Sequence, residues 1–176
     1  AVMWVAPRQD SLARRVYLAS SSVVRVALAA EAVEKFRLLV YHYQIDAELM
    51  PHSHRIQARA RVEFTALEDL NVAIFELHNG LRVTKVSDGG NKPLSVERLT
   101  QDSTVRVSLP SGLKKGQSSF LTFDYEGTLE SADDSPVPGL KLAYVGDDTS
   151  YLLYAGRWFP VNAYGINRFT SNITVI

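Results

Sequence analysis

The residues of this sequence best suited to metal chemistry are its four histidines. His52 and His54 stand two positions apart between two predicted strands, so on an extended backbone their imidazoles would point the same way and could share a metal ion. A zinc site needs further ligands, often a carboxylate, and the sequence spaces none beside this pair. We therefore favour solvated loop histidines at these two positions, and we expect His42 and His78 on strand surfaces or edges.

Other catalytic and cation-binding patterns are weak or absent. Asp133–Asp134 and Asp147–Asp148 could bind a hard cation, but they lack the spacing of a calcium loop, which favours solvated carboxylates. No histidine is followed by Glu, so the helical H-E-x-x-H zinc motif is absent from the sequence, as are a G-x-S-x-G elbow and a glycine-rich phosphate loop. The absence of cysteine excludes disulfides and a cysteine nucleophile. We expect no catalytic residue and no metal ligand in this chain.

The stretch "TSYLLYAGRWFPVN" (149–162) breaks the alternation found elsewhere in the sequence. Gly156 would let the backbone turn or approach a neighbour closely, and Pro160 would end a strand ladder because it has no N–H. Arg157 could stack on a ring or clamp a carboxylate. The block 151–164 is therefore interpreted either as a structural corner or as an aromatic groove for peptide or glycan. Its aromatic residues are Tyr151, Tyr154, Trp158, Phe159 and Tyr164.

The composition predicts a folded domain with no broad charged surface. The 176 residues are 46% hydrophobic and 22% charged, which is typical of a globular chain and long enough for a sizeable core. The formal net charge of zero argues against a nucleic-acid partner. No apolar run is long enough for a transmembrane segment. The start lacks an initiator Met and the end stops within a predicted strand, so we expect a domain truncated at its C-terminal end.

Two regions differ in hydrophobic period. Residues 1–38 are rich in Ala, Leu, Arg and Glu, and within them 22–38 carries an apolar stripe at helical spacing, which predicts an N-terminal helical segment. That helix would dock on a sheet or bind a partner. From Tyr41 the period changes to two, so residues 39–176 are predicted to be an antiparallel β domain, a sandwich or a saddle-like sheet.

The predicted strands follow one another at short intervals, with turn signals such as "DGGNKP" between them. The first two, joined by "MPHSH", form a predicted hairpin. On its polar face we expect the arginines of the second strand to pair across with Asp46 and Glu48 of the first. The strands are predicted at 41–49, 55–66, 72–77, 81–87, 93–99, 104–109, 119–129, 140–145, 150–155 and 168–175.

The segment "YLLYAGRWFPVNAYGINRFTSNITV" resembles the close of the N-terminal domain in the zinc aminopeptidase family typified by membrane alanyl aminopeptidase and leukotriene-hydrolase-like enzymes. That family carries a run of the form A-R-x-x-F-P-C-x-D-x-P-x-x-K-A-x-F-x-I. Here "AGRWFP" takes its first part, "VNAYG" replaces the Cys-x-Asp-x-Pro, and "NRFTSNITV" takes the place of the last strand. The opening hairpin is also similar, so the resemblance covers about 40–176.

The resemblance implies a non-catalytic β domain that packs on a thermolysin-like catalytic domain and shapes its substrate entrance. The zinc and the G-x-M-E-N loop would belong to that missing domain, in a parent metallo-aminopeptidase that is exported or membrane-attached. Where the family places a Gln near the substrate amine, Thr149 or Ser150 stands here. The expected substrate-facing edge is Thr149, Ser150, Tyr151, Tyr154, Arg157, Trp158 and Phe159.

A further expectation concerns self-association. If the strand at 168–175 lacks a partner, it exposes an unpaired edge. We therefore expect a homo-oligomer formed through that edge.

Overall fold

The structure is a computed structural model that describes residues 37–130, 137, 139–162 and 168–176. The chain divides into two units, Ala1–Glu34 and Lys35–Ile176, and the described residues all belong to the second. The predicted helical segment lies outside the described residues except at its end. There Leu38 opens the first strand and does not close a helix. The division at residue 38 stays a prediction.

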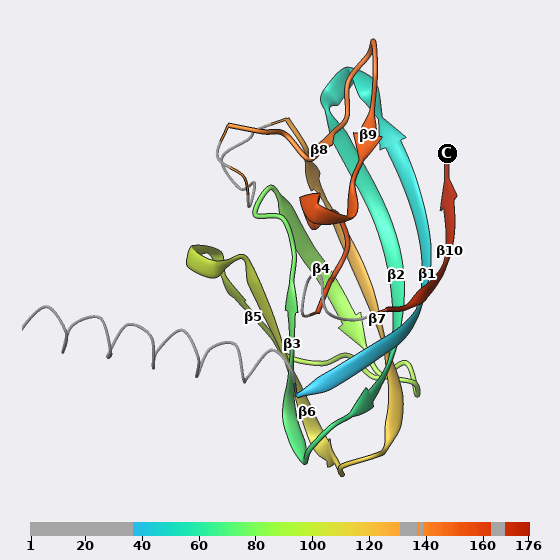
Figure 1. The fold of residues 1–176 in the computed structure, drawn as a ribbon, viewed down its shortest axis with the longest axis vertical. Helices are drawn as coiled ribbons and strands as arrows, with labels where there is room; N and C mark the ends of the chain where they lie inside the picture. Colours follow the sequence, from blue (N-terminus) through green and yellow to red (C-terminus); the bar gives the residue numbers. More distant parts are fainter. Residues whose placement is uncertain (1–36, 131–136, 138, 163–167) are drawn as a thin grey trace, which may run out of the picture. The chain divides into compact units, whose positions relative to one another are not determined.

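The described residues are mainly β, as predicted, and are shown in Figure 1. None of their helices is long and apolar enough to span a membrane. The elements are β1 (Leu38–Met50), η1 (Pro51–Ser53), β2 (Arg55–Ala66), β3 (Leu70–Glu76), β4 (Leu81–Ser87), β5 (Val96–Leu99), η2 (Thr100–Asp102), β6 (Thr104–Leu113), β7 (Ser118–Thr128), β8 (Ala143–Tyr144), β9 (Tyr151–Leu152), η3 (Tyr154–Gly156) and β10 (Thr170–Val175).

These strands form three sheets. The largest has the order β10-β1-β2-β7-β4, the second has β3-β6-β5, and β8 pairs with β9. The predicted hairpin of β1 and β2 is confirmed, with Ala47 opposite Ala58 in an antiparallel register. The last strand differs from the expectation of a wholly antiparallel sheet, because β10 lies parallel to β1.

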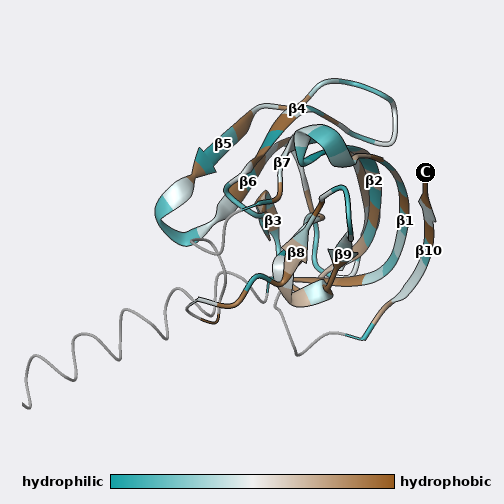
Figure 2. Cartoon of the chain, turned by 90° about the horizontal axis from the view of Figure 1, so that it is seen from above, coloured by the Kyte–Doolittle hydropathy of each residue, from teal (hydrophilic) through white to brown (hydrophobic). Residues whose placement is uncertain are grey.

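The two larger sheets face each other across one core. On β1 and β2 the apolar residues alternate with polar ones, so Ile45 and Ile56 are fully buried while their neighbours stay accessible. Phe75 of β3 packs edge-on against Phe64 of β2 and Phe123 of β7, and these contacts join the layers. Figure 2 shows the larger sheet curving around the shorter elements.

Several predicted strands are shorter in the structure. The stretch 93–99 contributes only β5, and Pro93 makes an isolated bridge to Ser87. The stretches 140–145 and 150–155 contribute two residues each, β8 and β9, and the second runs directly into the 3₁₀ turn η3. Some of their apolar residues, such as Ala143 and Val145, join the core, but these stretches do not form long ladders.

Candidate functional site

The aromatic block is folded as a corner at one end of the domain. We call residues 149–162 the corner segment. After β9 and η3 it runs along β3, where Val161 and Glu76 exchange two backbone hydrogen bonds of 2.9 and 2.7 Å. The Asn162 side chain donates to the Ile74 carbonyl at 2.9 Å. The corner segment therefore supplies backbone partners to the edge of β3 that faces away from β6.

Two aromatic residues of the corner segment lie in the core. Trp158 and Phe159 are each only 3% exposed. The Phe159 ring packs edge-on against Trp158 and Tyr43, with centroids 4.9 and 5.0 Å apart, and also contacts Tyr154. Trp158 and Phe159 were predicted to belong to the substrate-facing edge, but their rings are packed in the core and do not lie on the surface of the corner segment.

Gly156 fixes how closely the corner approaches β8. A Cβ built at this position would lie 2.7 Å from the Ala143 Cβ and 2.9 Å from the Ala143 nitrogen. Any larger residue would push the two segments apart, which is the close-approach role that the sequence predicted for this glycine. Pro160 is buried in the same turn.

Arg157 makes a mostly buried ion pair. Its Nε lies 2.8 Å from Oε2 of Glu76, and the two side chains are 21% and 9% exposed. Its backbone has the left-handed φ of 51°, and its carbonyl accepts the His78 N–H at 2.8 Å. Of the two roles predicted for Arg157, stacking on a ring or binding a carboxylate, the structure shows the second, because the side chain pairs with Glu76 of β3. Nothing in the sequence spacing pointed to Glu76 as its partner.

The exposed residues of the corner segment are Thr149, Ser150, Tyr151 and Leu153, and Tyr154 is half-buried. Tyr151 is 37% exposed, and its ring lies 5.9 Å from that of Tyr144. Ser150 Oγ accepts the Gly146 N–H at 3.2 Å, which shapes the loop that carries these residues.

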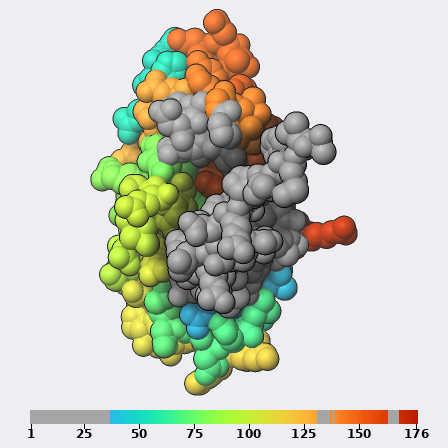
Figure 3. Space-filling view, turned by 60° about the vertical axis from the view of Figure 1, so that its left-hand side comes forward, coloured from blue at the N-terminus to red at the C-terminus, as the bar shows by residue number. Residues whose placement is uncertain are grey.

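The β1–β2 hairpin loop contacts the loop between β8 and β9 through two histidines. His54 Nδ1 donates to the Val145 carbonyl at 2.7 Å, and His52 Nδ1 lies 2.6 Å from Oδ1 of Asp147. Figure 3 shows this hairpin (cyan) beside the β8–β9 region (orange) at one end of the domain. His52 is solvated, as expected for a loop histidine, whereas His54 is partly buried and positions the neighbouring loop.

The remaining chemical candidates do not form a metal site. Within the described residues no group of three or more His, Asp or Glu could hold a metal ion. His42 binds the Thr170 hydroxyl on the sheet surface, as expected for a strand histidine. His78 is buried, contrary to the expected surface position, and its Nδ1 accepts the Gly80 N–H. Asp133–Asp134 lie outside the described residues.

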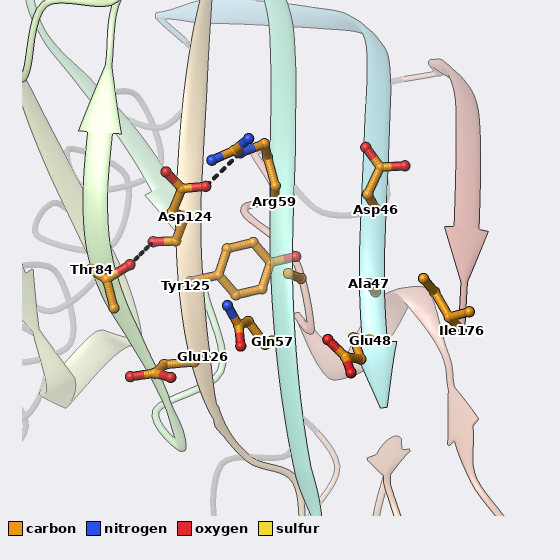
Figure 4. Close-up of a pocket in the computed structure, with 11 residues that line it drawn as sticks. Asp46, Ala47, Glu48, Gln57, Arg59, Thr84, Asp124, Tyr125, Glu126 and Ile176 are labelled. Atoms are coloured by element: carbon orange, nitrogen blue, oxygen red, sulfur yellow. Dashed lines mark hydrogen bonds and ion pairs between the residues drawn. The ribbon is translucent and has the colours of Figure 1, made fainter. Parts of the chain in front are cut away.

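The outward face of the large sheet carries a groove of about 400 Å³ that sequence analysis did not predict. The register places Arg59 opposite Asp46, but its guanidinium bonds Asp124 of β7 at 2.6 Å, as Figure 4 shows. This bond and the charge of Asp124 raise the pKa of Arg59. The expected pairing of β2 arginines with β1 carboxylates is therefore wrong: Arg55 also turns to β7, where it binds Glu126.

No family model and no curated protein matches the sequence, but solved structures do. An M1 zinc metallopeptidase mutant from Deinococcus radiodurans bound to a Tyr-Ser-Ala substrate has 21% identity and a TM-score of 0.66, covering 80% of this chain and 32% of that chain. The unmutated enzyme has 20% identity and a TM-score of 0.65 over the same shares. A two-domain M1 zinc metallopeptidase mutant bound to L-arginine has 22% identity and a TM-score of 0.65, covering 78% of this chain and 32% of that chain.

At these identities the likeness shows a shared fold. The predicted resemblance to zinc aminopeptidases is confirmed at that level. The chain spans about a third of the length of the metallopeptidases that it matches.

Proposed function

We propose that this chain is the non-catalytic N-terminal β domain of an aminopeptidase-like protein. The proposal rests on the fold that the chain shares with about a third of the length of each matched M1 zinc metallopeptidase. Its role is to pack on the catalytic domain and to shape the entrance through which a peptide reaches the metal. The partial coverage of the matched metallopeptidases is the observation that carries the proposal, because a domain that spans a third of an enzyme leaves two thirds for the catalytic machinery.

The part of the chain that the structure describes does not fit the zinc of such an enzyme. A catalytic zinc is held by three protein ligands with one open position. The described residues contain no group of three His, Asp or Glu with suitable geometry. His52 and His54 each bind a separate acceptor, Asp147 and the Val145 carbonyl. We therefore derive no catalytic step in this chain and assign zinc and bond cleavage to the missing catalytic domain.

The substrate-facing edge of the proposed domain is the exposed part of the corner segment. Thr149, Ser150 and Tyr151 are accessible, and the hairpin loop holds their loop in place. Trp158 and Phe159 support this edge from the core, and Arg157 anchors it to β3. A tyrosine ring with an accessible edge and hydroxyl suits contact with a peptide side chain or amine.

The purified chain provides the first test. We expect no bound zinc and no hydrolysis of aminoacyl-7-amido-4-methylcoumarin substrates when the chain is assayed alone. Metal analysis that finds one zinc per chain, together with turnover that a chelator abolishes, would show that the chain is itself a peptidase and would end the proposal.

The second test uses the peptidase that contains this chain. Replacing Tyr151 by Ala is expected to raise KM for peptide substrates several-fold and to leave kcat within about twofold, because the side chain contacts substrate and not the reacting bond. The matched control is Tyr41→Ala, which removes a similarly exposed tyrosine from β1, and this variant should leave both constants unchanged. Equal effects of the two substitutions would refute a role for the corner segment at the entrance.

A second candidate function is a free-standing β-sandwich module that binds peptide or glycan through the aromatic block. The neighbouring, mutually tilted rings of Tyr151 and Tyr144, with Lys141 4.7 Å from the Tyr144 ring centre, favour it because accessible aromatic rings can form a binding platform. Burial of Trp158 and Phe159 removes two of the aromatic rings, among them the indole, from such a platform. Titration with peptides and oligosaccharides, followed by intrinsic fluorescence, tests this function, and no response to either class would exclude it.

A further inference from the structure

The outer edge of β10 is open in the described structure. β10 lies at one end of the five-stranded sheet, and none of the described strands pairs with its other side (Figure 1). All six of its residues are exposed. Ile173 and Val175 are 47% and 48% exposed although they share the face of Ile45 and Ala47, which are buried. Apolar side chains on the core face of the sheet thus extend beyond the core.

The pairing with β1 identifies the free backbone groups. The Ile176 N–H donates to the Ala47 carbonyl, and the Ile176 carbonyl accepts the Leu49 N–H, so both groups of Ile176 point to β1. Along a strand these directions alternate from residue to residue. The N–H and C=O groups of Ser171, Ile173 and Val175 therefore point away from β1, toward the open edge.

The two edges of this sheet differ in their protection against pairing. At the β4 edge, Arg82 and Lys85 are exposed and the register shifts between Val83 and Lys85. Charges and bulges of this kind prevent pairing with another strand. β10 has the sequence TSNITV, with no charge, proline or glycine, and its pairing with β1 continues without a register shift. Only the β10 edge is left ready to accept a strand.

We propose that a second copy of this chain occupies the β10 edge, with the two β10 strands antiparallel about a two-fold axis at Ile173. This register places Ile173 opposite its own copy and Ser171 opposite Val175, so every outward N–H and C=O of these three residues gains a partner. It also packs the half-exposed Ile173 against Ile173 of the second copy and places Val175 beside Ser171 of that copy. The pairing does not depend on the proposed peptidase role.

Charge favours a second copy over other partners. β10 offers no charge that an acidic or basic partner could complement. The whole chain has a formal net charge of zero, so two copies do not repel each other at long range. An isologous pair needs only one self-complementary edge, and β10 supplies it.

Association can be measured on the full chain by light scattering from roughly 1 µM to roughly 1 mM, the range expected for a small interface. We expect the mass to rise from that of one chain to that of two. Ile173→Lys should hold the chain monomeric, because two ammonium groups would meet at the axis. Leu140→Lys, which changes a similarly exposed residue far from β10 in sequence, should dimerise like the original chain. Circular dichroism checks that both variants fold.

The absence of cysteine permits a test of the register. The proposed axis makes Asn172 of one copy and Thr174 of the other a non-hydrogen-bonded pair, with Cα atoms about 4.5 Å apart, within reach of a disulfide. Mixing the Asn172→Cys and Thr174→Cys chains under mild oxidation should give a covalent heterodimer in large excess over either chain alone.

Three outcomes would overturn the proposal. The first is a chain that stays monomeric over the whole concentration range. The second is a mixture of the two cysteine variants that cross-links no more than each variant alone. The third is a chain that remains monomeric but gains amide protection in β10 when a peptide is added, which would assign the edge to a peptide strand.

Discussion

The ion pair between Arg157 and Glu76 is expected to hold the corner segment on β3. The pair joins residues far apart in sequence at 2.8 Å, and both side chains are largely shielded from water. Replacing Arg157 by Ala would remove the cation and leave the Glu76 carboxylate in its buried position without this partner. We expect the substitution to destabilise the whole domain, because the corner segment packs on the same core as the two sheets.

The size of the effect follows from burial. Removing one partner of a fully buried pair costs about 3–5 kcal/mol, while an exposed pair contributes about 1 kcal/mol or less. Arg157 is 21% exposed and Glu76 9%, so we expect Arg157→Ala to lower the free energy of unfolding by about 2–3 kcal/mol. In a Glu76→Gln background the same change should cost only about 1 kcal/mol, since position 76 then carries no buried charge that the arginine compensates.

A third variant separates the ion pair from the backbone. Arg157 has a φ of 51°, which costs a residue with a Cβ about 1 kcal/mol more than glycine. Arg157→Gly should therefore be about 1 kcal/mol less destabilised than Arg157→Ala. Urea unfolding, followed by tryptophan fluorescence and circular dichroism, measures all variants. If Arg157→Ala cost the same with Glu76 and with Gln at position 76, the ion pair would carry no coupling energy and the reasoning would be refuted.

Two further predictions concern close packing and buried hydroxyls. Gly156→Ala should lower the free energy of unfolding by about 1–3 kcal/mol, because its Cβ would overlap Ala143; an unchanged urea midpoint would contradict this close approach. Burial raises the pKa of Tyr43 and Tyr125, so in the folded state both keep their protons above the pH of about 10 at which the unfolded chain ionises. The unfolded state then binds fewer protons, and each tyrosine should lower stability by about 1.4 kcal/mol per pH unit above pH 10. Tyr125→Phe should reduce that slope by about half in urea unfolding at alkaline pH. At pH 7 it should leave stability equal or higher, because the described residues give this hydroxyl no hydrogen-bond partner; a clear loss of stability would contradict that assignment.

The strands and the opening hairpin could be predicted from the sequence because their signal is local. In β1 and β2 the alternation of apolar and polar residues reports directly which side chains face the core. The same holds for Gly156, whose lack of a side chain predicted a close approach. The corner interpretation of Trp158 and Phe159 rested on their size, and the structure buries both.

Other features depend on residues that are distant in sequence. The Arg59 side chain has carboxylates on both neighbouring strands, and only the order β1-β2-β7 made Asp124 available as its partner. His78 is buried because the corner segment passes beside it, and its own surroundings in the sequence gave no sign of this. The groove on the outward face likewise needs residues of four strands, β1, β2, β4 and β7, together with Ile176.

The sequence by itself therefore determined the β class and the positions of the long strands, because hydrophobic periodicity acts over a few neighbours, whereas for the aromatic block it left a corner and a groove open. Only the tertiary structure decided that β10 lies parallel to β1, that Arg157 binds Glu76 and that Thr149, Ser150 and Tyr151 are accessible while Trp158 and Phe159 are buried. These features arise from strand order and packing, which bring together groups whose distance in the chain carries no local signal.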